Sequence, residues 1–94
     1  IITVEAGDTF IIELEENPST GYSWSYEIEP ETSLSLVSEK FSASQGEEIA
    51  GAPGSHEFVF KALKEGESQI LFDYIRPWER EDVEKTYIFR FIVR

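Results

Sequence analysis

The chain has 94 residues, of which 19 are acidic and 8 are basic, so its formal net charge is -11. Because such a charge repels phosphate backbones and anionic lipids, we expect neither nucleic acid nor a membrane as a partner. Hydrophobic residues make up 40% and aromatic residues 14%, enough for one folded core, and we expect residues 1–94 to form a single domain. The absence of cysteine excludes disulfides, thiolate metal sites and a cysteine nucleophile.

Alternation of apolar and polar residues predicts strands along the whole chain. The first is expected from Ile2 to Val4, and the second, from Thr9 to Leu14, alternates over six residues. The clearest alternation, from Tyr22 to Ile28, places four large apolar residues on one face, and we expect Trp24 on that face to be part of the core. Later strands are predicted around residues 34–41, 58–62, 70–74 and 87–93.

These runs predict an all-β fold. Val37 breaks the parity of its run and indicates a bulge. No stretch sustains a helical apolar period, and turn residues separate the runs at spacings of roughly ten residues. Seven or eight short strands at such spacings favour an immunoglobulin-like antiparallel β-sandwich, which tolerates the lack of a central disulfide.

Three of the expected loops carry residues that fix loop shape or offer binding surface. Pro18 and Gly21 preorganise the first loop, because proline fixes φ and glycine allows a tight turn. Trp78 and Arg76 belong to the residue types that dominate binding energy at interfaces. The three segments are Asn17-Pro18-Ser19-Thr20-Gly21-Tyr22, Gly51-Ala52-Pro53-Gly54 and Arg76-Pro77-Trp78. If strands run up and down, all three loops share one end of the sandwich.

In order and approximate spacing, these segments resemble the three loops of the chagasin-like family of cysteine peptidase inhibitors, which carry Asn-Pro-Thr-Thr-Gly-aromatic, Gly-x-Gly-Gly and Arg-Pro-Trp. The resemblance spans nearly the whole chain. It implies a reversible competitive inhibitor of papain-like cysteine peptidases, whose three loops occlude the active-site cleft. By the same resemblance, the thirteen residues of the three segments contact the peptidase, although Tyr22 begins the next strand and has a mainly structural role.

Two positions depart from the family pattern. Ser19 replaces the first threonine, and Pro53 stands where the middle loop usually has glycine. Proline lacks the backbone donor and narrows φ. If that donor normally bonds the enzyme, affinity drops; otherwise Pro53 stiffens the loop. The sequence does not choose between these two readings.

No residue pattern supports catalysis. His56, the only histidine, has no cysteine, serine elbow or paired carboxylate motif to complete a triad, and we expect it to be a solvated loop residue. The acidic run from Glu79 to Glu84 is expected to be a solvated hairpin. We therefore expect neither an enzyme nor a bound cofactor or metal.

One alternative function and one alternative structure remain open at this point. An immunoglobulin-like adhesion or carbohydrate-binding module would use Trp78 to stack on its ligand. Structurally, Trp78 could fold back on the sandwich while Arg76 stacks on an aromatic ring. We expect a monomer when free. Members of the resembled family are often exported, so we expect a periplasmic or extracellular location; a leader segment before Ile1 would fit this.

Overall fold

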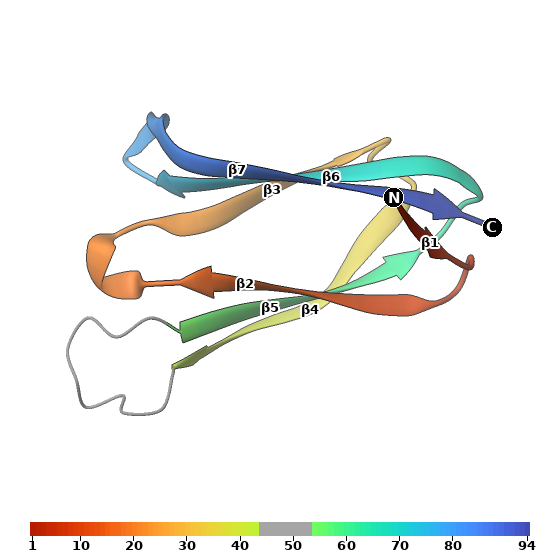
Figure 1. Ribbon diagram of the computed structural model, residues 1–94, viewed down its shortest axis with the longest axis horizontal. Helices are drawn as coiled ribbons and strands as arrows, with labels where there is room; N and C mark the ends of the chain where they lie inside the picture. The colour runs from red at the N-terminus through yellow and green to blue at the C-terminus, as the bar shows by residue number, and fades with distance from the viewer. Residues whose placement is uncertain (44–53) are drawn as a thin grey trace.

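The computed structural model describes residues 1–43 and 54–94, in which the chain forms seven strands and one short 3-10 turn (Figure 1). The strands are β1 (Ile2–Val4), β2 (Thr9–Glu16), β3 (Ser23–Glu29), β4 (Leu34–Ala43), β5 (Gly54–Ala62), β6 (Gly66–Arg76) and β7 (Glu79–Val93). The 3-10 turn η1 (Pro18–Thr20) lies between β2 and β3. Among these described residues, no helix is long and apolar enough to cross a membrane.

The strands form two layers, which Figure 1 shows one above the other. One sheet has the order β1-β7-β6-β3 and the other β2-β5-β4. All pairs are antiparallel except β1 with β7, which is parallel. The predicted immunoglobulin-like sandwich is confirmed. The short parallel pair of β1 and β7 was not predicted, because the alternation of apolar and polar residues does not show the direction in which two strands pair.

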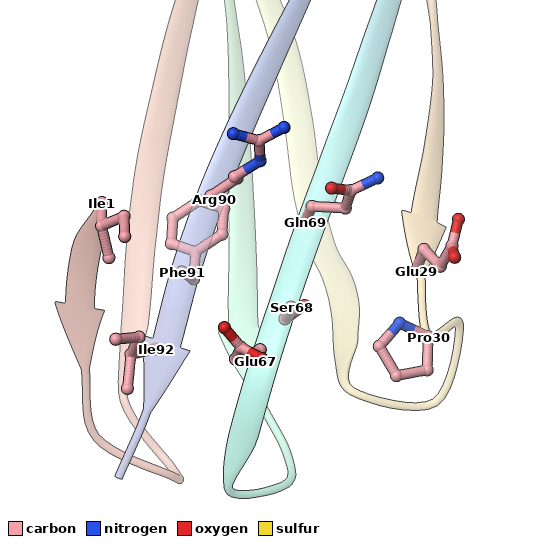
Figure 2. Close-up of a pocket in the computed structure, with 9 residues that line it drawn as sticks. All are labelled: Ile1, Glu29, Pro30, Glu67, Ser68, Gln69, Arg90, Phe91 and Ile92. Atoms are coloured by element: carbon pink, nitrogen blue, oxygen red, sulfur yellow. The ribbon is translucent and has the colours of Figure 1, made fainter.

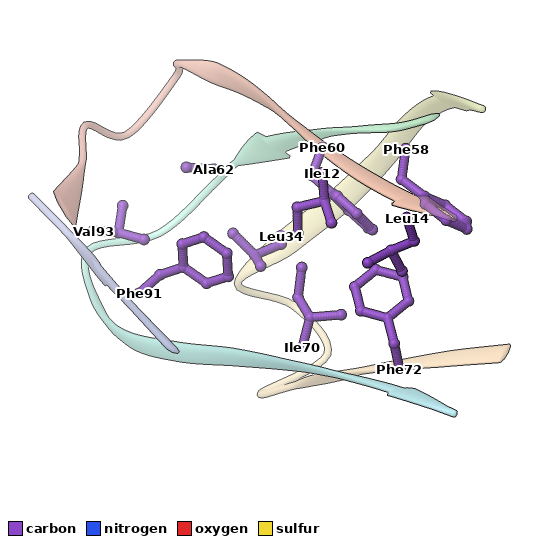
Figure 3. Packing of buried hydrophobic residues seen from close by; sticks show 10 residues of the cluster. All are labelled: Ile12, Leu14, Leu34, Phe58, Phe60, Ala62, Ile70, Phe72, Phe91 and Val93. Carbon is purple, nitrogen blue, oxygen red and sulfur yellow. The ribbon is translucent and has the colours of Figure 1, made fainter. Parts of the chain in front are cut away.

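The core lies between the two sheets and is rich in aromatic rings (Figure 3). Phe72 of β6 lies with its ring centroid 5.1 Å from that of Phe58 and 6.0 Å from that of Tyr26. Aromatic pairs at such separations add to the free energy of burial. Trp24 and Tyr26 pack against this cluster partly buried, as expected. The buried cluster comprises Ile12, Leu14, Leu34, Phe58, Phe60, Ala62, Ile70, Phe72, Phe91 and Val93.

The predicted strands exist, but three begin earlier than alternation indicated. β5 begins at Gly54 rather than Phe58, β6 begins at Gly66 rather than Ile70, and β7 begins at Glu79 rather than Tyr87. Residues 79–84 of β7 are all exposed, so the hydrophobic pattern carries no signal there and only backbone pairing defines the strand. The predicted bulge at Val37 is confirmed by a shift of the β4–β5 register between Leu36 and Ser38.

The strand ends that flank the three motifs lie at one end of the sandwich (Figure 1). The register requires this arrangement: Gly54 at the start of β5 lies opposite both Glu16 at the end of β2 and Ala43 at the end of β4. In the other sheet, Ser23 at the start of β3 lies opposite Ile75 near the end of β6. This placement agrees with the prediction of one shared edge for the first and third loops, while residues 51–53 of the middle motif lie outside the described residues.

Candidate functional site

The first loop is held in shape by its own side chains. Asn17 precedes η1, and its Oδ1 accepts hydrogen bonds from the backbone N of Ser19 at 3.2 Å and from Ser19 Oγ at 2.7 Å. Thr20 Oγ1 donates to the Asn17 carbonyl at 2.8 Å and accepts from the Tyr22 backbone N at 3.2 Å. Pro18 lies in the first turn, where a proline nitrogen loses no helical hydrogen bond. The loop is therefore preorganised, as its sequence predicts.

Gly21 ends this turn in a conformation that favours glycine. Its φ is +83°, in the left-handed region, and its N–H donates to the Pro18 carbonyl at 3.1 Å. A Cβ added here would lie 2.6 Å from Cη2 of Trp78. The glycine thus serves both the backbone turn and the close approach of the tryptophan.

The third loop is the tight connection between β6 and β7. Pro77 and Trp78 lie at its tip and are exposed, and Trp78 keeps 68% of its surface accessible although it contacts Gly21. Trp78 therefore rests on the first loop rather than on the core of the sandwich. Because most of the indole remains accessible, it can contact a partner.

Arg76 points from the end of β6 toward the first loop. Its Cζ lies 4.5 Å from the centroid of the Tyr22 ring, and its Nε donates to the Thr20 carbonyl at 3.4 Å. The stacking of Arg76 on an aromatic ring, one half of the structural alternative, is therefore present. The other half, Trp78 folded on the sandwich, is not.

Tyr22 joins the first loop to both strands of the β6–β7 hairpin. Its ring stacks on Tyr74 at 5.3 Å between centroids, and its hydroxyl donates to Oδ2 of Asp82 at 2.9 Å. The hydrogen bond to the Asp82 carboxylate is the main reason that the pKa of Tyr22 lies above its ordinary value, while the nearby Arg76 acts in the opposite direction. The structure supports the expectation that Tyr22 has a mainly structural role.

Of the middle motif, Gly51, Ala52 and Pro53 lie outside the described residues. Gly54 is described: it is buried, and an added Cβ would collide with the Ser42 carbonyl oxygen and lie 2.6 Å from Cζ of Phe41. This crowding at the base of the middle loop explains glycine at position 54.

The expectation for His56 is wrong, because it is a half-buried residue of β5. Its Nδ1 lies 2.9 Å from Glu16 Oε1 and its Nε2 lies 2.8 Å from Glu39 Oε1. Its ring stacks on Phe58 at 4.2 Å. The sequence held a signal that was missed: His56 continues the inward-facing parity of Phe58 and Phe60.

No chemistry beyond binding emerges from the described residues. Within residues 1–43 and 54–94, no group of three or more histidine, cysteine or acidic side chains is arranged to hold a metal ion. A pocket of about 330 Å³ lies at the other end of the sandwich, lined by residues at the end of β3, the start of β6 and the end of β7 (Figure 2). Its lining, which includes Glu29, Gln69 and Arg90, contains no residue of the three motifs.

The sequence matches one protein family over almost its whole length. The sequence model of the family described as Chagasin family peptidase inhibitor I42 matches residues 3–93. Amoebiasin-2 of Entamoeba histolytica is 36% identical over 78 residues, which make up 82% of this chain and 63% of that protein. The chain therefore spans less than two thirds of the length of this curated relative.

Solved structures share the fold. The crystal structure of EhICP2, a cysteine protease inhibitor from Entamoeba histolytica, has a TM-score of 0.84 at 30% identity and covers 99% of this chain and 87% of that one. PbICP-C in complex with falcipain-2 has a TM-score of 0.70 at 24% identity, covering 98% and 84%. The second likeness concerns the fold alone.

Proposed function

This chain belongs to the chagasin family of peptidase inhibitors, and we propose that it is a reversible, competitive inhibitor of papain-like cysteine peptidases. The family consists of inhibitors, so the prediction that the chain is not an enzyme is confirmed by its membership. The solved relative EhICP2 supports the target class, since it is a cysteine protease inhibitor.

In this proposal the three motif loops fill the cleft of the peptidase. The middle loop blocks the catalytic cysteine, and the first and third loops contact the two rims beside it. The contact residues are Asn17, Pro18, Ser19, Thr20, Gly21, Tyr22, Gly51, Ala52, Pro53, Gly54, Arg76, Pro77 and Trp78. The inhibitor makes no covalent bond, because binding alone excludes the substrate.

One observation carries the proposal: two distant motifs form one surface. Tyr74 Oη accepts a hydrogen bond from the Asn17 backbone N at 2.9 Å, Arg76 lies over Tyr22, and Trp78 lies against Gly21. All three hairpin residues therefore contact the first loop. The first and third loops are thus one preorganised edge, which lowers the ordering cost of binding.

The edge suits a peptidase cleft in composition and size. Its tip exposes Pro18, Ser19, Thr20, Pro77 and Trp78, a mixture of rigid rings and small polar groups. Protease–inhibitor interfaces bury about 800 Å² per partner, a scale that three adjacent loops at the end of a sandwich can supply. No observation specifically favours the carbohydrate-binding alternative.

The direct test is inhibition of papain with a fluorogenic substrate, beside an unrelated serine peptidase. We expect competitive inhibition of papain that is reversed by dilution, and none of the serine enzyme. Trp78→Ala should raise the inhibition constant by about 30-fold, because tryptophan truncation at an interface costs about 2 kcal/mol or more. If the folded protein inhibits no papain-like enzyme, the proposal fails.

A further inference from the structure

Asp82 lies outside the three motifs but contacts residues of two of them. It stands in β7, four positions beyond Trp78, on the outer strand of the hairpin. Its Oδ2 accepts the hydrogen bond from the Tyr22 hydroxyl at 2.9 Å and lies 3.9 Å from Nη1 of Arg76. One carboxylate oxygen therefore faces both a residue of the first motif and a residue of the third.

The Tyr22 ring is the element that this carboxylate holds. One neighbour is Tyr74, stacked at 5.3 Å, and another is Arg76, whose Cζ lies 4.5 Å from the ring centroid. Arg76 also donates to the Thr20 carbonyl. The stacking fixes the plane of the ring, and the hydrogen bond to Asp82 fixes the position of its hydroxyl end.

The surroundings of Asp82 favour an action through Tyr22 and Arg76. The Asp82 side chain is 46% exposed and that of Arg76 36%, so the ion pair alone is weak. The hydrogen bond from a phenol to a carboxylate is charge-assisted and therefore stronger than a neutral one. The raised pKa of Tyr22, caused first by this hydrogen bond, agrees with the geometry.

We propose that Asp82 is a positioning residue for inhibition, which holds the first and third loops in one arrangement through Tyr22 and Arg76. This inference rests on the proposed function. Asp82 acts before binding: it keeps the Trp78 tip and the Pro18–Thr20 turn at the separation that a cleft requires, so less conformational freedom is lost when the peptidase binds. Arg76 stabilises the same edge through its contacts with Tyr22 and Thr20.

A double-mutant cycle on inhibition of papain tests the inference. Asp82→Ala removes the acceptor, and Tyr22→Phe removes the donor while it keeps the ring that stacks on Tyr74. Each should raise the inhibition constant by about tenfold, the scale of one charge-assisted hydrogen bond at a partly exposed site. The double variant should be no worse than Asp82→Ala alone, because Tyr22→Phe removes a contact that Asp82→Ala has already removed.

Two further variants separate position from charge. Glu81→Ala removes the same charge one residue away and measures the general electrostatic effect. Asp82→Asn loses the charge but keeps an oxygen acceptor, so it should recover part of the inhibition lost in Asp82→Ala. The NMR signals of the Tyr22 ring should shift in Asp82→Ala and not in Glu81→Ala, a readout that does not depend on any peptidase.

The possible results distinguish the two proposals. If the wild type inhibits papain but Asp82→Ala inhibits equally well, or if the two single effects add, the positioning role is overturned and the proposed function stands. An effect of Glu81→Ala as large as that of Asp82→Ala also overturns it in favour of plain charge. If the wild type does not inhibit at all, the proposed function fails and takes the positioning role with it.

Discussion

Gly21 and Trp78 are in such close contact that a Cβ on Gly21 would lie 2.6 Å from the indole Cη2. The two residues are far apart in sequence and come from two different motifs. Their contact joins the glycine of the first loop and the tryptophan of the third in one surface. It also shows that each motif depends on the other for its shape.

Gly21→Ala should damage this surface more than the backbone strain alone predicts. Alanine at φ +83° costs about 1 kcal/mol of stability, and its Cβ would also displace the Trp78 ring. The matched control is Gly7→Ala, which has φ +95° but no atom within 4 Å of the added Cβ. Denaturant unfolding should show similar losses for both variants, while only Gly21→Ala should weaken inhibition. Equal inhibition by the two variants would contradict the contact.

Gly54→Ala should destabilise the base of the middle loop. The added methyl group would meet the Ser42 carbonyl and the Phe41 ring, and overpacking of this kind costs about 1 to 3 kcal/mol. Ser55→Ala, at the neighbouring half-buried position, serves as control. Chemical denaturation compares the two, and a Gly54→Ala variant as stable as wild type would show that the strands separate without cost.

His56→Phe should destabilise the fold although it keeps the ring that stacks on Phe58. Glu16 is only 8% exposed, and loss of its imidazole partner leaves a buried carboxylate unsatisfied, a loss of about 1 to 3 kcal/mol. Glu39, the other partner, is more exposed, so Glu39→Gln should cost less than about 1 kcal/mol. Urea unfolding would contradict this account if the two variants lost the same stability.

The stability should fall as pH rises above 10. The pKa of Tyr26 lies above its ordinary value of 10.0 because of burial and the nearby Glu39, and that of Tyr22 lies above it because of Asp82. The unfolded chain releases these protons first, so each tyrosine stabilises the fold below pH 10, and this contribution is lost as pH rises through the folded pKa. Tyr26→Phe should therefore flatten the alkaline decline measured by thermal unfolding. An unchanged decline in that variant would exclude Tyr26 as its source.

Much of the fold could be predicted because local patterns determine it. Alternation located the strands, and the parity break at Val37 located the bulge, since both depend on which side of a strand faces the core. The start of β7 at Glu79 was missed because both faces of the strand are exposed to solvent there. The motif loops were recognisable because proline and glycine act on the backbone of their own segment.

Contacts between distant segments could not be read from the sequence. The imidazole of His56 meets Glu16 and Glu39 only because three strands lie side by side in the order β2-β5-β4. The contact of Asp82 with Tyr22 depends likewise on how the hairpin lies over the first loop. Charged residues in a run look solvated from the sequence, so nothing distinguished Asp82 from its neighbours.

The central claim, that the three-loop edge occupies the cleft of a papain-like peptidase, is tested most directly by calorimetric titration of active and blocked papain. One sample of enzyme has its cleft filled by a peptidyl reagent bound covalently to the catalytic cysteine, and a second carries only a small alkyl group on that cysteine. We predict that the inhibitor binds the active enzyme and does not bind the enzyme with the filled cleft. It should also bind the alkylated enzyme, at least in part through the first and third loops. Equal affinity for the filled and the open enzyme would contradict the claim, because it would place the inhibitor outside the cleft.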